Sequence, residues 1–184
     1  MGYPLDFVPE LLVLGLLYSP QAKGEEALVE SLERSFGPIR RRGPSFPFPW
    51  SGYYDEEMGG RPRRSFLSFE RLLDPSTLAQ IKLATNDIEA SFSESGSRRF
   101  NIDPGLLSLG RFVLATTKDR PHRIPLGQGI YGELTLIFEN GEYRALPWTY
   151  PDWASEEHRS LLAAYREDLK LGLRSLKREV GSGA

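Results

Sequence analysis

The apolar run at residues 11–18, LLVLGLLY, constrains the fold of this chain more than any other stretch. It is far shorter than the roughly 20 residues that a membrane-spanning helix needs. It follows Asp6 and Glu10 rather than a basic segment, which argues against a secretory signal. We therefore expect a buried strand in a soluble, cytoplasmic protein that has no membrane partner.

Helix signals follow the run at three places. Ser19 and Pro20 are typical of an N-cap and a first helical position, and Asp74 and Pro75 repeat the pattern before a second apolar stripe. A third amphipathic helix is predicted over residues 155–179. The second helix also carries a polar face that differs from its buried one: Lys82, Asn86 and Glu89.

Strand-like runs lie between and after these helices. Residues 65–69 precede the second helix and residues 98–102 follow it, and longer strands are predicted over 106–117 and 130–138. Asn140-Gly141 is the strongest hairpin signal, because a type I′ turn needs positive φ at both central residues.

The order of these elements predicts an α+β fold. The first six match a split βαββαβ unit of the ferredoxin-like kind, extended by an antiparallel meander with its hairpin and by a C-terminal helix. A chain of 184 residues is long enough for one domain. We expect a single domain over residues 1–180 and a flexible tail over 181–184.

Charge is distributed unevenly along the chain. The net charge is −2, so neither nucleic acid nor membrane is an expected partner. Residues 34–71 and 98–124 are nevertheless each net +4. A small anion suits such basic segments, although solvated surface arginines would explain them too. The chain has no cysteine, which excludes disulfides and zinc–thiolate sites.

The second basic segment contains the densest group of candidate ligand-binding residues, the sequence TTKDRPHR at 116–123. Thr117, Lys118 and Arg123 are hydrogen-bond donors suited to phosphate or carboxylate, and Asn101 lies shortly before them. His122 is a candidate catalytic acid or base near neutral pH. The simpler alternative is a basic turn between strands.

Glycines follow this segment in a G-x-G-x-x-G pattern at Gly127, Gly129 and Gly132. The pattern leads into a strand rather than a helix, so it does not predict a dinucleotide fold. Backbone N–H groups at Gly127 and Gly129 could approach an anion, or these glycines could serve tight turns alone. No G-x-x-x-x-G-K-[ST] occurs, which excludes a P-loop nucleotide site.

Two acidic residues are the candidate metal ligands. Asp103 and Glu133 could hold Mg²⁺ or Mn²⁺, hard cations that need only one or two carboxylates besides substrate oxygens, and Asp103 could instead handle a proton. With two histidines in the chain, a multi-histidine metal site is not expected, nor is a haem or flavin site.

Two segments rich in proline and aromatic residues, 43–60 and 146–153, are predicted to form extended loops. Trp50, Tyr54 and Trp148 in these loops could stack on a planar ligand. The same side chains could instead cap the core, anchor a protein partner or support a homo-oligomer.

Several of these motifs resemble a known family when they are taken in order. LGLLYSP, FPFPWSGYYDEEMG, SFLSFERLLDPSTLAQIKLATNDIE, NIDPGLLSLGRFVLATTKDRPHRIPLGQGIYGELTLIF and LPWTYPDW together are similar to an uncharacterised bacterial family, domain-of-unknown-function family 4416, over about residues 8–172. Some members carry an automatic GTP-binding label, but the chain has neither a P-loop nor N-K-x-D. The resemblance implies a shared ligand site at the polar motifs.

Two hypotheses about function follow from the sequence. The first is the binding of a phosphorylated or other anionic small molecule, a nucleotide among the candidates, together with a divalent metal. This hypothesis extends to a phosphoester hydrolase or transferase. The alternative is a non-catalytic protein-interaction module that uses the aromatic-proline loops.

Overall fold

The computed structural model describes residues 2–19, 21–50, 52, 58, 60–94 and 96–182, with the backbone alone over 179–182. Over these residues the chain forms a nine-stranded sheet whose paired strands are all antiparallel. The strand order is β2-β4-β1-β5-β6-β8-β7, with β3 beside β4 and β9 beside β8. The strands are β1 (Glu10–Tyr18), β2 (Ile39–Arg42), β3 (Phe46–Pro47), β4 (Arg63–Leu73), β5 (Phe100–Leu107), β6 (Arg111–Thr116), β7 (Arg123–Gly127), β8 (Ile130–Glu139) and β9 (Glu142–Ala145).

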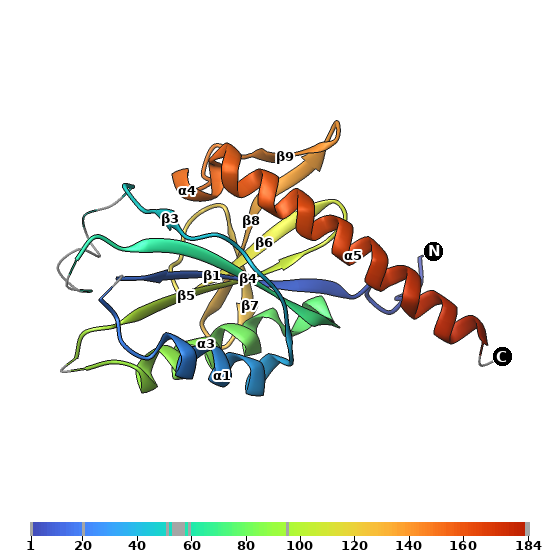
Figure 1. The fold of residues 1–184 in the computed structure, drawn as a ribbon. Coiled ribbons are helices and arrows are strands. Elements are labelled where there is room, and N and C mark those ends of the chain that lie inside the picture. Colours follow the sequence, from blue (N-terminus) through green and yellow to red (C-terminus); the bar gives the residue numbers. More distant parts are fainter. Residues whose placement is uncertain are drawn as a thin grey trace.

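Helices cover both faces of this sheet. The described helices are α1 (Glu25–Phe36), the 3-10 turn η1 (Pro75–Thr77), α3 (Leu78–Ser91), α4 (Pro151–Ala154) and α5 (Glu156–Ser182). Helices α1 and α3 lie on one side of the sheet, and α4 and α5 lie on the other (Figure 1). The chain is thus an α+β domain, as its sequence predicts.

The apolar run forms β1, in the middle of the sheet between β4 and β5. Its side chains alternate between two cores: Leu12 and Leu14 pack in the core shared with α1 and α3, and Leu11 and Val13 in the core shared with α5. All four side chains are fully buried. This burial confirms the predicted buried strand. Burial of each side chain contributes about 1.5–3 kcal/mol, so the strand contributes strongly to the stability of the fold.

The stretch 106–117 is not one strand, so that prediction was wrong. β5 ends at Leu107 and β6 begins at Arg111, and a tight turn joins them. The side chain of Ser108 accepts hydrogen bonds from the N–H groups of Gly110 and Arg111, at 3.2 and 3.0 Å. A serine hydroxyl that mimics a backbone turn gives a weak sequence signal, which the apolar residues on both sides obscured.

The predicted start of the first helix was also wrong. α1 begins at Glu25, with Gly24 in a left-handed conformation as its N-cap, and Ser19 instead begins a turn in which its carbonyl accepts from the N–H of Ala22 at 2.9 Å. Pro20 lies outside the described residues. The second helix does begin as predicted, because the Asp74 side chain accepts from the N–H of Ser76 at 2.8 Å.

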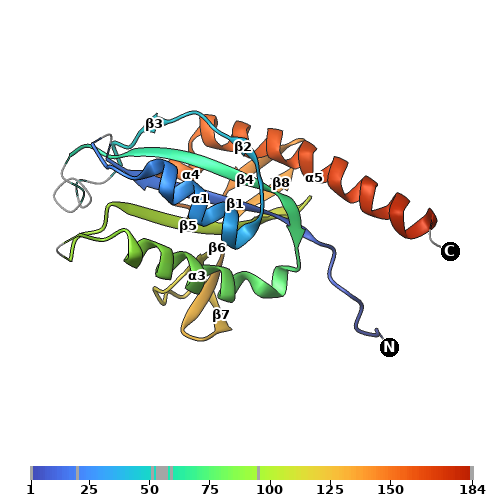
Figure 2. The ribbon, with the colours of Figure 1, turned by 60° about the horizontal axis from the view of Figure 1, so that its bottom comes forward.

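The end of the chain forms the predicted hairpin and closing helix, but its strands do not form a simple meander, because β8 lies between β6 and β7. Asn140 and Gly141 have φ of 53° and 89°, which confirms the hairpin turn between β8 and β9. α5 crosses the sheet and continues to Ser182, so residues 183–184 of the predicted tail lie outside the described part of the chain. Figure 2 shows the β7 hairpin beside α3. Within the described residues, no helix combines the length and apolar character needed to cross a membrane.

Candidate functional site

A cavity of about 510 Å³ opens where β5 and β6 separate. The two strands pair only from Gly105↔Leu114 to Leu107↔Phe112. β6 continues alongside β8, whereas residues 100–104 of β5 remain paired with β1 alone. One edge of β5 therefore faces the cavity instead of a neighbouring strand.

Pro104 marks the point where the pairing stops. Backbone groups of alternate residues in a strand point to the same side, so the nitrogen of Pro104 points to the same edge as the N–H of Ile102. Proline has no N–H to donate to a neighbouring strand. The sequence NIDPG thus contributes to the gap in the sheet directly.

Two side chains of α3 replace the missing strand at Ile102. Glu89 Oε1 accepts from the Ile102 N–H at 2.8 Å, and Lys82 Nζ donates to the Ile102 carbonyl at 2.8 Å. The carboxylate and the ammonium lie 3.7 Å apart, and both residues are buried. Burial raises the pKa of Glu89, although the charge of Lys82 opposes this. The polar face of the second predicted helix is therefore the floor of the cavity.

A buried arginine closes the cavity from the opposite face of the sheet. Arg64, whose side chain is 5% exposed, places Nη1 2.8 Å from Asp103 Oδ2 and Nη2 2.9 Å from Asp152 Oδ2. Its guanidinium lies over the rings of Phe48 and Trp153, with centroids at 5.3 and 5.8 Å. Burial alone would raise the pKa of Asp103, but the charges of Arg64 and Lys82 lower it below its usual range, so this carboxylate is ionised.

Asn101 presents an unsatisfied donor on the β5 wall. The residue is 6% exposed, and its Oδ1 accepts from Arg98 Nη1 at 3.1 Å. Among the described residues, Nδ2 makes no hydrogen bond of good geometry, although the Asn101 side chain lies close enough to Asp103 to help lower the pKa of that carboxyl by hydrogen bonding. A buried donor left without a partner costs about 1–3 kcal/mol. Such a cost is tolerated where a ligand supplies the acceptor.

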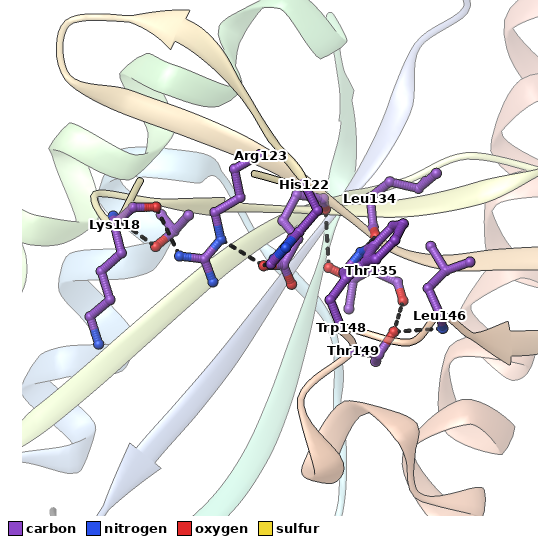
Figure 3. A network of polar contacts seen from close by, with 10 residues as sticks. Lys118, His122, Arg123, Leu134, Thr135, Leu146, Trp148 and Thr149 are labelled. Atoms are coloured by element: carbon purple, nitrogen blue, oxygen red, sulfur yellow. Dashed lines mark hydrogen bonds and ion pairs between the residues drawn. The ribbon is translucent and has the colours of Figure 1, made fainter. Parts of the chain in front are cut away.

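The opposite wall comes from the end of β6, the following loop and the β7 hairpin. Arg123 donates from Nε to Glu133 Oε2 at 2.7 Å and from Nη1 to the Lys118 carbonyl at 2.8 Å. Thr116 Oγ1 accepts from the Lys118 N–H at 3.2 Å. In the described part of the chain, neither the ammonium of Lys118 nor the hydroxyl of Thr117 has a hydrogen-bond or ion-pair partner, and both residues are exposed. Figure 3 shows the extended Lys118 side chain.

His122 and Trp148 form a latch behind this wall. His122 Nε2 lies 3.1 Å from Glu133 Oε2, and its ring stacks on Trp148 at 5.2 Å between centroids (Figure 3). Trp148 Nε1 donates to the carbonyl of Leu134 at 2.8 Å, and Thr149 donates to that of Thr135. These two carbonyls lie between the stretches of β8 that pair with β7 and β9. The latch fixes residues 146–150, which bring Tyr150 to the cavity.

The glycine pattern forms the turn between β7 and β8. Gly127 and Gly129 have φ of 101° and 74°, and Gln128 between them also has a positive φ of 55°. None of the three lines the cavity. In this position the glycines permit a tight hairpin, and an anion in the cavity would not meet their N–H groups.

Six of the residues singled out in the sequence meet at this one cavity. They are Asn101, Asp103, Thr117, Lys118, Arg123 and Glu133. His122 and Trp148 lie behind Glu133 and Arg123 rather than on the lining, and Trp50 is exposed outside it. Tyr54 lies outside the described residues.

The sequence did not identify several residues of the lining, among them Arg64, Arg98 and Asp152. They come from β4, from the loop before β5 and from α4, and nothing in their local sequence distinguishes them from surface charges. Lys82, Asn86 and Glu89 did share a recognisable face of the second helix. A second polar face on a helix that packs against a sheet was therefore the sequence signal that could have identified these three lining residues.

The predicted metal ligands both line the cavity, and each already has a cationic partner. Asp103 pairs with Arg64 and Glu133 with Arg123. No group of three or more histidine, aspartate or glutamate side chains that could hold a metal ion occurs among the described residues. The carboxylates have the right donor chemistry for Mg²⁺, but a metal would have to compete with two guanidinium groups.

The fold and the cavity define an α+β domain with a polar ligand-sized site in a split sheet. The chain belongs to the family described as domain of unknown function DUF4416, whose model matches residues 8–169. The match spans every element of the cavity walls described above. Neither the curated proteins nor the solved structures contain a match to this chain.

Proposed function

We propose that the cavity between β5 and β6 binds a phosphorylated or other anionic small molecule. The observation that carries this proposal is Lys118, which lines the cavity together with Thr117 and Arg123 and whose ammonium has no ion-pair partner in the described part of the chain. Arg123 uses Nε and Nη1 in bonds to the protein, and its Nη2 makes none with the described residues. Donors of this kind favour phosphate or carboxylate oxygens.

The size and charge of the cavity support the same proposal. Its volume of about 510 Å³ is in the range of sites for small organic ligands and exceeds what an inorganic ion alone needs. Five basic and four acidic side chains of the described residues line it. The formal charge of these side chains is therefore +1, which favours an anionic ligand over a cationic one.

A divalent cation is a separable part of the proposal. Mg²⁺ or Mn²⁺ would reach Asp103 or Glu133 together with ligand oxygens, in competition with the arginines that those carboxylates face. Binding assays with and without the cation test this part independently of the anion site.

Phosphoester hydrolysis or transfer is the chemistry that this inventory would support best. In this extension the donors of Lys118 and Arg123 stabilise charge on the phosphoryl oxygens. Glu133 orients His122, and Asp103 is the ionised carboxylate on the opposite wall. His122 would need to reach the ligand from behind the lining, so binding is the primary proposal and catalysis its extension.

The fold proposal goes with this function. We infer that β1, α1, β2, β4, α3 and β5 form a ferredoxin-like unit, supported by the strand order β2-β4-β1-β5 and by the placement of α1 and α3 on one face (Figure 2). β6, β8, β7 and β9 extend this unit, and the cavity lies at the junction between the unit and the extension.

Exposed aromatic residues favour a second candidate, a non-catalytic protein-interaction module. Trp50 is 47% exposed and Tyr150 is 54% exposed, and aromatic side chains often anchor protein interfaces. This candidate predicts a change of oligomeric state or a protein partner that is lost in Trp50→Ala, and no response to small anions.

The experiment that separates the candidates measures thermal stability and calorimetric binding with phosphate, pyrophosphate, nucleotides and carboxylates, each with and without Mg²⁺ or Mn²⁺. A ligand at about 100 times its Kd stabilises the protein by roughly 2.7 kcal/mol, which raises the melting temperature by about 5–11 °C at this chain length.

The Lys118→Met variant supplies the residue-level test of the anion site. It should lower anion affinity about tenfold or more, because a charge-assisted hydrogen bond is lost. Lys177→Met, an exposed lysine near the end of α5, is the matched control and should bind as the parent does. Equal affinity in the parent and Lys118→Met, or no response to any anion, would contradict the proposal.

A further inference from the structure

We infer that the ligand of the cavity is a phosphorylated polyol, such as a sugar phosphate, whose hydroxyl groups bind the wall formed by Asn101 and Asp103. The inference rests on the proposed anion site and names the class of its ligand. It depends on a difference between the two walls of the cavity. On one wall the cation of Lys118 has no ion-pair partner among the described residues and Arg123 beside it is paired with Glu133, whereas the β5 wall offers the Asn101 amide beside the Asp103 carboxylate, which Arg64 balances.

The orientation of the Asn101 amide follows from its partner. A guanidinium only donates hydrogen bonds, so the amide atom that faces Arg98 Nη1 at 3.1 Å must be the oxygen Oδ1. The NH₂ group then points the other way, and within the described residues it makes no hydrogen bond of good geometry, although it lies near the Asp103 carboxylate. The residue lines the cavity and is 6% exposed. A ligand oxygen on this wall would satisfy a donor that the protein leaves unsatisfied.

Asp103 decides which kind of oxygen this can be. It lies two residues from Asn101 on the same face of β5, and its side chain keeps 29% exposure, although Oδ2 accepts from Arg64. An ionised carboxylate accepts hydrogen bonds and repels a second anion. A hydroxyl group donates and accepts at once, so hydroxyls fit a wall that offers a donor beside an acceptor.

An ammonium group fits the same wall less well. The carboxylate of Asp103 is already balanced by the guanidinium of Arg64 and the nearby ammonium of Lys82, so a further positive charge gains little there. Asn86 on α3 and Tyr150 line the cavity as well. Neutral amides and an aromatic ring suit the hydroxyls and C–H groups of a polyol.

The ligand would therefore span the gap in the sheet. Its phosphate would meet Lys118 and Arg123 at the ends of β6 and β7, and its hydroxyls would meet Asn101 and Asp103 on β5. Separation of β5 from β6 creates both walls, because neither Asn101 nor Lys118 would face a cavity if the strands remained paired. The separation of β5 from β6 would therefore determine the preference for a ligand that carries both a phosphate and hydroxyl groups.

Calorimetric titration of the full chain tests the inference with two ligands that share the phosphate. Methyl phosphate carries no hydroxyl on its organic part, and ribose 5-phosphate carries several. We expect ribose 5-phosphate to bind about tenfold more tightly or better, from one or two net hydrogen bonds, and free ribose to bind far more weakly than either phosphate. These comparisons use the unchanged protein and do not depend on the folding of a variant.

The Asn101→Ala variant assigns the preference to the β5 wall. It should reduce the ratio of the two affinities toward one, whereas Gln80→Ala, which removes an exposed amide from α3, should preserve it. Equal affinity of the parent for the two phosphates would overturn this inference and leave the anion site standing. A preserved preference in Asn101→Ala would also overturn it. Failure of every phosphate to bind would overturn the anion site itself, and with it this inference.

Discussion

Replacement of Lys82 by methionine tests whether side chains of α3 supply the hydrogen bonds that a neighbouring strand would otherwise make to β5 where β5 and β6 separate. The ammonium donates to the Ile102 carbonyl at 2.8 Å and balances Glu89 at 3.7 Å, and its side chain is 9% exposed. Methionine keeps most of the apolar stem, so packing changes little. The substitution removes the charge and leaves a strand carbonyl and a buried carboxylate without their cation.

The magnitude can be worked from these contacts. A hydrogen bond to a charged group contributes about 1.5–3 kcal/mol, and loss of one partner of a buried ion pair costs about 3–5 kcal/mol when the other stays charged. Glu89 limits the second cost because it can take up a proton. We expect Lys82→Met to lower the free energy of unfolding by about 2–4 kcal/mol, which lowers the melting temperature by about 4–16 °C.

Urea denaturation followed by circular dichroism measures this loss. Lys170→Met is the matched control, since its ion pair with Glu167 is exposed and contributes less than about 1 kcal/mol. The deficit of Lys82→Met should also be smaller at pH 4 than at pH 7, because a protonated Glu89 needs no cation. A loss below about 0.5 kcal/mol at pH 7 would refute the view that α3 side chains complete the edge of β5.

Two further predictions concern the same region. Burial raises the folded-state pKa of Glu89 above 4.5, so the folded protein holds this proton more tightly than the unfolded chain, and stability falls as the pH rises from about 4.5 through the raised pKa. Glu89→Gln should remove this part of the pH dependence in urea titrations between pH 4 and 8, and an unchanged pH profile would count against it. Gly15→Ala should cost about 1–3 kcal/mol, because the new Cβ would lie 2.8 Å from the Trp153 ring and 3.1 Å from Arg64 Nη1. Denaturation monitored by tryptophan fluorescence checks this, and equal or greater stability would show that the ring moves freely.

Local chemistry accounts for the parts of the fold that could be predicted. The apolar run forms the central strand, Asp74 caps the start of the second helix, and Asn140-Gly141 forms the turn between β8 and β9. Each of these features depends on a residue and its immediate neighbours. The two errors at the level of elements have local causes as well. Ser108 makes a turn without a glycine–asparagine signal, and Gly24 rather than Ser19 precedes α1.

The candidate site was predictable in part for a similar reason. Thr117, Lys118 and Arg123 are near one another in the sequence, so their grouping survives in almost any fold. Their arrangement around Glu133 depends on the pairing of β7 with β8, which the glycine-rich turn permits but does not specify. The latch of His122 and Trp148 joins segments that the sequence keeps apart, and it withdraws both rings from the lining.

The sequence by itself determined which segments are buried strands, where the main hairpin turns and which segment concentrates donors for an anion. Only the tertiary structure decided that β5 leaves β6 after three residue pairs and that Lys82, Glu89 and Arg64 close the resulting gap. The physical reason is the range of the interactions. Periodicity, capping and turn preferences act over a few residues, whereas a buried charge has no local signature and is stabilised only by partners that the fold brings from distant segments.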